Sequence, residues 1–264
     1  MAVATVVLGL LLVVFGQMDA LDEVMNEASS RDWALIVLVG VLRFGVGVGF
    51  YFAAVQHAGV STAAPILSLG TILVVAGSVI LGMSPFSLML ILAGVVASVG
   101  GVALGMGLKS QRTITNKHEL HKGVMYALLA CLLISAGHLM IAKVNPKLPS
   151  GAVTWFALLL GSIGYLVILG LSGQLGRLVA IPFREVVAFG CHGLLSFAGA
   201  YWLFLEALNI LKVGRTQVIT GVWPAVAALV GVVMFHEKMN RAKVIGTAMM
   251  ILGAILAVLS RSAG

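Results

Sequence analysis

Nine apolar runs, separated by short polar segments, account for most of this chain of 264 residues. A membrane-spanning helix requires about 20 mostly apolar residues, because each residue rises only 1.5 Å along the helix axis. Backbone polar groups in hydrocarbon must pair internally, so only helices and closed barrels cross a membrane. The runs lack the period-two alternation of barrel strands. We therefore predict an all-α integral membrane protein with about nine transmembrane helices, at residues 3–15, 33–55, 61–82, 86–107, 124–142, 153–171, 186–208, 216–235 and 244–259.

The composition supports this fold class and limits the partners. Hydrophobic residues make up 61% of the chain and charged residues 9%, with a mean hydropathy of +1.13, which leaves no room for a separate soluble domain. We expect a multi-pass protein of the cell membrane whose main partner is the lipid bilayer. The net charge of +7 does not indicate nucleic acid, because the basic residues are scattered through short loops, where they act as topology signals. Cys131 and Cys191 lie in apolar runs and suggest neither a disulfide framework nor a metal site.

Two segments near the N-terminus leave alternatives open. The run 3–15 is short for a span, and a cleaved signal peptide is the competing interpretation, although a basic leading region and a cleavage site are lacking. The segment 17–32 carries five of the nine acidic residues, with apolar residues at helical spacing. It is either a short amphipathic helix at the membrane surface or a solvated acidic loop.

The chain contains a weak internal repeat. A shift of 153 residues places the helices of the first half on those of the second and Gly100 on Gly253. We therefore expect a first repeat at 1–107 with four helices, a connecting loop at 108–123, and a second repeat at 124–261 with five. A unit of five helices is odd, so its two copies face opposite sides of the membrane. This is the inverted-repeat plan of many secondary transporters, with the substrate site between the copies, although here the 5+5 pattern is incomplete.

Motifs in residues 201–259 resemble the EamA domain of the drug/metabolite transporter superfamily. They are Ala207-Leu208, Pro224 in the next helix, His236-Glu237-Lys238 at a turn, and Gly246 and Gly253 in the last helix. The likeness extends over 122–261, and over the first half from the family's second helix onward. It implies ten helices in two repeats, a central substrate cavity, export or exchange of small metabolites, and an anchoring role for Glu237.

Two departures from the family pattern stand out. The family's first helix is missing, which indicates a misassigned start, a fragment or a nine-helix variant. In the first repeat, Thr71 and Ser84 stand where the second has Pro224 and Glu237.

Ionisable residues inside spans are costly, and by default they are functional candidates. Arg43, Glu206, His138 and His192 meet this criterion, and helical geometry places His192 and Glu206 on one face with Ser196. We hypothesise that Arg43 binds an anionic group such as a carboxylate and that Glu206 binds a cationic group or a coupling proton, with both histidines assisting. The alternatives are that Arg43 pairs with Glu206, or that each extends to the nearer interface.

Aromatic residues complete the candidate substrate-binding set. Trp202 and Trp223 can line a cavity, although Trp is also common in the interfacial belts of membrane proteins. Kinks are expected at Pro65 and Pro224, which lie inside predicted helices.

We predict a secondary transporter of small metabolites, amino-acid-like or drug-like, that works as an exporter or exchanger. It requires no cofactor and is driven by a gradient, since the sequence carries no ATP-binding motif and no motif of a membrane enzyme. The alternative is a non-transporting fragment or helper subunit that completes its bundle with a partner chain. A homodimer is a further prediction.

Overall fold

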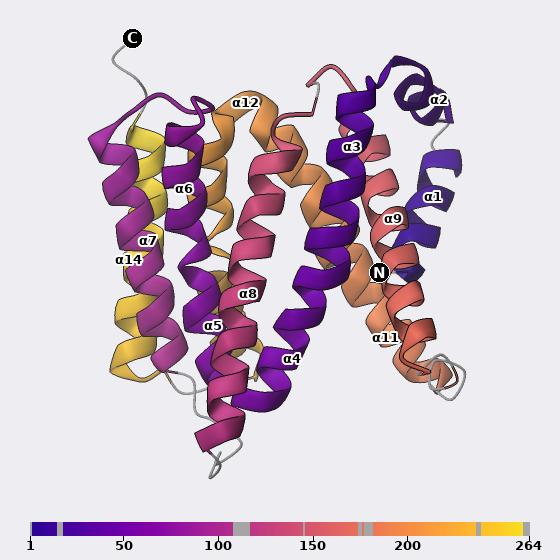
Figure 1. Ribbon diagram of the computed structural model, residues 1–264. Helices are drawn as coiled ribbons and strands as arrows, with labels where there is room; N and C mark the ends of the chain where they lie inside the picture. Colours follow the sequence, from indigo (N-terminus) through magenta and orange to yellow (C-terminus); the bar gives the residue numbers. More distant parts are fainter. Residues whose placement is uncertain are drawn as a thin grey trace. The chain divides into compact units, whose positions relative to one another are not determined.

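The computed structural model describes residues 2–14, 18–107, 117–144, 146–173, 176, 182–235 and 239–260, and these contain helices but no strand (Figure 1). Seven continuous helical stretches, three of which join consecutive elements, are long and apolar enough to cross a membrane. The number is eight if α1 (Ala2–Val14) and α2 (Met18–Glu27) form one broken span. This confirms the all-α membrane fold class. The turn at 236–238, which carries Glu237 of the family motif, and most of the predicted loop at 108–123 lie outside the described residues.

The predicted count of nine spans is not confirmed, because two of the predicted runs form short helices. α1 and α13 (Trp223–Phe235) have 13 residues each, fewer than the ~20 that a span requires. The predicted span at 216–235 is interrupted by a turn at Gly221 and Val222. Pro224 follows as the second residue of α13, in the first helical turn, where a missing backbone N–H costs no helical hydrogen bond.

The acidic segment is helical over α2, so the alternative of an irregular loop is wrong for these residues. Val24 is fully buried, and α2 contacts α9 (Ser150–Leu171). Met25, on the same predicted stripe, is 62% exposed. The helix is therefore amphipathic, with an apolar face that is only partly covered.

The helices form two compact units, each of which takes segments from both halves of the sequence. The first comprises Met1–Val46 and Met140–Ile210, and α9 is its central element, contacting α1, α2 and α3 (Ser30–Leu38). Small residues allow this packing: a Cβ atom on Gly161 would lie 2.8 Å from the carbonyl oxygen of Gly40. The indole of Trp155 donates a hydrogen bond to the carbonyl oxygen of Thr5 at 3.1 Å, which ties α1 to α9.

The second unit comprises Gly47–Leu139 and Leu211–Gly264. It contains α4 (Val48–Ala58), α5 (Val60–Ser68), α6 (Gly70–Ile80), α7 (Leu88–Met106), most of α8 (Lys117–Ile141), the end of α12 (Ala200–Thr220), α13 and α14 (Arg241–Leu259). Its closest helix pair is α7 and α14, which lie side by side (Figure 1). A Cβ atom on Gly246 would lie 2.4 Å from the backbone nitrogen of Leu104 and 2.6 Å from the carbonyl oxygen of Gly100. Only glycine permits this approach.

Element boundaries recur along the chain with the spacing of the predicted repeat. α7 and α14 have 19 residues each, start 153 residues apart, and follow the capping residues Ser87 and Asn240. α6 and α13 also start 153 residues apart. The division into repeats at 1–107 and 124–261 stays a prediction, which these matching boundaries support.

Two residues with non-helical backbone angles, Gly59 and Lys212, also lie 153 residues apart. Gly59, before α5, has a φ of 76° and a ψ of 162°, and Lys212, inside α12, has a φ of 65° and a ψ of 165°. This region of the backbone map suits glycine and is strained for any residue with a Cβ atom.

Replacing Lys212 by glycine should therefore stabilise the protein. Relief of the strain outweighs the larger backbone entropy of glycine in the unfolded chain, so we expect the free energy of unfolding to rise by about 1 kcal/mol. Thermal unfolding in detergent measures the change. The control Asn209→Gly places glycine at an exposed position of the same helix and should destabilise by a similar amount. A lower unfolding temperature for Lys212→Gly would show that this break is not strained.

Candidate functional site

The guanidinium of Arg43 packs against two buried aromatic rings of the first unit. The central carbon of its guanidinium lies 4.5 Å from the ring centre of Phe44 and 4.4 Å from that of Tyr201. Arg43 itself is half-buried, whereas Phe44 is 1% and Tyr201 3% exposed. An arginine over aromatic faces is stabilised by the negative charge density of the rings. The two rings thus position a cation inside a predominantly apolar segment.

Two π-helical segments bring these residues into place. The segment η1 (Val39–Gly47) carries Arg43 and Phe44, and η2 (Leu194–Gly199) carries Ser196 and Phe197. A π-helix is wider than an α-helix, and such turns are often found at functional sites. Phe44 packs edge-to-face against Phe197, with ring centres 6.2 Å apart, and against Tyr201 at 4.9 Å. The rings therefore connect η1 to η2 and to the start of α12.

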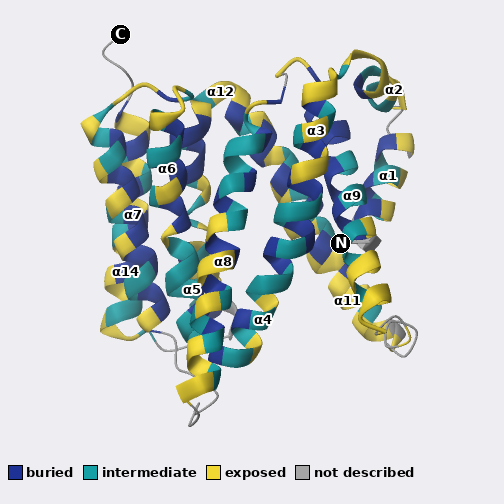
Figure 2. Cartoon of the chain, viewed as in Figure 1, coloured by how far each residue is buried: buried dark blue, intermediate teal, exposed yellow. Residues whose placement is uncertain are grey.

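The predicted polar residues of the continuous stretch formed by α11 (Phe183–Gly193), η2 and α12 are exposed. His192, Ser196 and Glu206 all lie on its outer surface, and much of α11 is exposed (Figure 2). His192 Nδ1 and Ser196 Oγ are 3.4 Å apart. The Trp202 indole donates a hydrogen bond to Glu206 Oε1 at 3.3 Å. We call His192, Ser196 and Glu206 the polar stripe.

The polar stripe and the residue that contacts Arg43 lie on different sides of this stretch. Tyr201, which contacts Arg43, is buried, as are Phe204 and Leu205, whereas Glu206 is exposed and accepts its described hydrogen bond from Trp202. This arrangement gives no support to the alternative in which Arg43 pairs with Glu206.

The remaining predicted site residues belong to the second unit. His138 is half-buried on α8, and Trp223 is 64% exposed as the first residue of α13. The predicted set of seven residues is thus divided, with five in one unit and two in the other.

Two features of the structure were not predicted from the sequence. The first is the hydroxyl group of Tyr201, which is buried and has no hydrogen-bond partner among the described residues. The sequence signal that could have found Tyr201 is its position directly before the predicted site residue Trp202.

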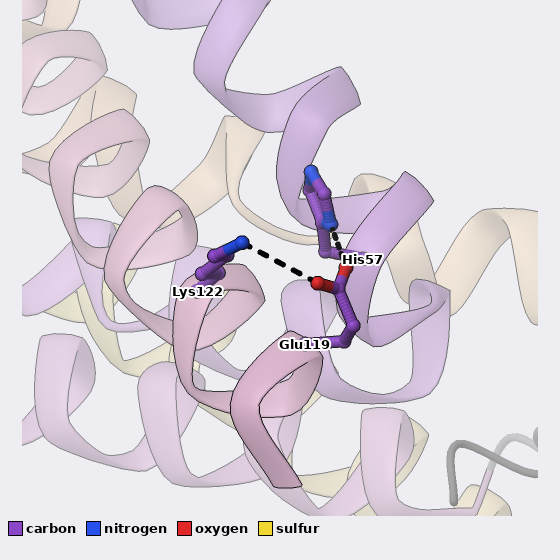
Figure 3. A network of polar contacts seen from close by, with 3 residues as sticks. All are labelled: His57, Glu119 and Lys122. Atoms are coloured by element: carbon purple, nitrogen blue, oxygen red, sulfur yellow. Dashed lines mark hydrogen bonds and ion pairs between the residues drawn. The ribbon is translucent and has the colours of Figure 1, made fainter. Parts of the chain in front are cut away.

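The second is a network of polar contacts in the second unit, drawn in Figure 3. His57 Nδ1 lies 2.5 Å from Glu119 Oε2, and Lys122 Nζ lies 3.4 Å from Glu119 Oε1. His57 is in the last turn of α4 and Glu119 in the first turn of α8, where a carboxylate suits the positive end of the helix dipole. The Tyr126 ring lies 5.5 Å from that of His57.

A close helix approach explains why this network can form. A Cβ atom on Gly123 would lie 2.3 Å from the Cβ of Ala58, so the end of α4 meets the start of α8 at a glycine. Sequence alone could not pair His57 with Glu119, because 62 residues separate them.

No group of three His, Cys, Asp or Glu residues suited to a metal ion occurs in the described part of the chain. Both cysteines are free thiols, Cys131 buried and Cys191 exposed.

A double-mutant cycle tests the His57–Glu119 pair. Its members are partly exposed, so we expect a coupling energy of about 0.2–1 kcal/mol between His57→Gln and Glu119→Gln. Thermal unfolding of both single variants and the double variant in detergent measures it. The double variant should lose less stability than the single losses added together. Strictly additive losses would show that the two side chains do not interact.

Comparison with known proteins identifies the family. The model of the EamA-like transporter family matches residues 1–106 and 121–259. A protein of known crystal structure is similar over 98% of this chain and 97% of its own, with a TM-score of 0.63 and 16% sequence identity, which shows a shared fold. A search of curated proteins found no match. Members of the matched family are transporters rather than enzymes. Because the family model covers most of its length, the chain belongs to the EamA-like transporter family and is a multi-pass membrane transporter of the drug/metabolite type.

Proposed function

We propose that the chain is a secondary transporter that moves small, amino-acid-like or drug-like metabolites across the cell membrane as an exporter or exchanger. The observation that carries this proposal is the polar stripe. It lies in a stretch, Arg184–Thr220, that is long and apolar enough to cross a membrane.

The cost of placing these groups against lipid supports a hydrated environment. A charged side chain at the centre of a spanning helix costs about 2.5–3.5 kcal/mol on insertion scales, and such residues normally face water-filled cavities. His192, Ser196 and Glu206 are exposed, and their described bonds run only one helical turn along the same stretch. The remaining hydrogen-bonding capacity of Glu206 and His192 is then available to water or to substrate.

Each predicted site residue has a role in this proposal. Glu206 binds a cationic group or the coupling proton, and Trp202 orients its carboxylate. His192 and Ser196 supply neutral hydrogen bonds, and Arg43 binds an anionic group. His138 and Trp223, in the second unit, stay predicted substrate-binding residues. The predicted inverted repeat supports a gradient-driven mechanism, since many secondary transporters share that plan.

Transport by the purified chain in proteoliposomes tests the proposal. We expect uptake of at least one member of a panel of amino acids and metabolites, and at least a tenfold loss in Glu206→Gln, which removes a charge at nearly constant volume. The matched control Glu185→Gln changes an exposed carboxylate in the first turn of α11 and should retain activity. Folded wild type without transport of any panel member would contradict the proposal.

Chemical labelling tests the hydrated stripe directly. In a background with Cys191→Ala, we expect Ser196→Cys to react with a membrane-impermeant thiol reagent at least ten times faster than Val99→Cys, because thiols react as thiolates in contact with water. Val99 is 48% exposed on α7 among other exposed apolar residues, Leu92 and Val95, so it represents a lipid-facing position. Equal rates at both positions would show that the stripe faces lipid.

A further inference from the structure

The buried hydroxyl of Tyr201 is an exception to the way polar groups are normally placed. Tyr201 is 3% exposed, and its Oη atom has no hydrogen-bond partner among the described residues. Nearly all buried polar side-chain atoms in proteins are hydrogen-bonded, so each exception needs an explanation. Phenylalanine would provide the same ring for packing against Phe44 without a buried hydroxyl. The hydroxyl is therefore not explained by packing.

The position of Arg43 supplies a second, independent observation. Its guanidinium carbon lies over the Tyr201 ring, 4.4 Å from the ring centre, and 4.5 Å from that of Phe44. The N–H groups of a guanidinium radiate in its own plane, in a fork that fits a carboxylate. The arginine donors and the tyrosine hydroxyl thus belong to side chains that are in direct contact.

Neighbouring aromatic rings restrict the orientation of the Tyr201 side chain. Phe44 packs edge-to-face against Tyr201, and Phe204 stacks on the tyrosine with ring centres 5.8 Å apart. Both phenylalanines are nearly fully buried. The tyrosine ring is consequently held in one orientation, and its hydroxyl cannot turn away to solvent.

We propose that the guanidinium of Arg43 and the hydroxyl of Tyr201 together bind the carboxylate group of the transported substrate. This inference rests on the proposed function and names the substrate class of the same site. A carboxylate has two oxygen atoms with four acceptor positions, so one group can accept from the arginine fork and from the hydroxyl at once. One cation with one neutral donor matches a singly charged carboxylate better than a phosphate, which offers more oxygen atoms and up to two charges.

Binding by the purified full chain in detergent tests this site separately from transport. The probes are matched pairs, benzoate with benzamide and lactate with lactamide, together with inorganic phosphate, each titrated while the unfolding temperature is followed. We expect a carboxylate to stabilise the protein at concentrations at least tenfold lower than its amide does. Arg43→Gln should abolish this preference.

The decisive variant is Tyr201→Phe, which keeps the ring and removes only the hydroxyl. Loss of a charge-assisted hydrogen bond should weaken carboxylate binding about tenfold. The protein without probe should unfold at the same temperature as wild type or higher, because an unpaired buried hydroxyl has been removed. A merely structural tyrosine would instead lower the unfolding temperature and leave binding unchanged. The control Tyr165→Phe removes the hydroxyl of a half-buried residue of α9 and should change neither quantity.

Several outcomes would overturn the inference. They are an unchanged preference for the carboxylate in Tyr201→Phe, tighter binding of phosphate than of both carboxylates, and no binding of either carboxylate. If neither carboxylate binds while proteoliposomes still show Glu206-dependent transport, the inference fails and the proposed function stands. If carboxylate binding depends on Arg43 and Tyr201 while no panel member is transported, the site stands and the proposed function fails.

Discussion

Close backbone contact between helices is the interaction on which this structure depends. In hydrocarbon, apolar side chains gain little by leaving lipid, so helices associate through tight van der Waals packing at small residues. Gly246 against Gly100, Gly161 against Gly40, and Gly123 against Ala58 are such contacts. At each of them, a Cβ atom added to the first-named glycine would approach the facing residue more closely than atoms can pack. Hydrogen bonds between helices, such as that from Trp155 to Thr5, add to this packing, but not every polar group in the spans is needed to hold helices together.

Two further sorts of polar group occur in the described helices. Some complete helix ends, as Ser29 and Asp32 do in the capping box before α3, and Asn240 before α14. Others, such as Glu206 and the Tyr201 hydroxyl, lie within apolar segments and satisfy no structural need of that kind. It is this second sort that a transporter can use to recognise a passing molecule, because such groups gain hydrogen bonds when the molecule arrives.

The fold class was predictable because hydrophobicity alone decides it. The apolar runs required no knowledge of tertiary contacts, and the motifs of the last helices indicated the family that the comparison confirmed. The number of spans was less predictable: the run at 216–235 is uniformly apolar, but Gly221 and Val222 form a turn just before Pro224, and a hydropathy pattern does not show such a break.

The candidate site was predictable only in part. Ionisable residues in apolar runs can be recognised one by one, because each is costly to place in a membrane. This criterion indicated Arg43, Glu206, His138 and His192. What each contacts depends on partners far away in the sequence. Tyr201 meets Arg43 only because η1 and the start of α12 belong to one unit, and His57 meets Glu119 only because a glycine lets α4 approach α8. No spacing along the chain encodes these contacts.

The start of α12 carries the ring that supports Arg43 and, one and a half turns later, the carboxylate of Glu206 on the exposed side. Between these two positions the helix is regular, so it behaves as a short rod. Any roll of this rod about its axis turns both groups through the same angle in the same sense. The ring that supports Arg43 and the carboxylate of Glu206 are therefore coupled through the helix backbone, so a rotation of the helix that moves one also moves the other.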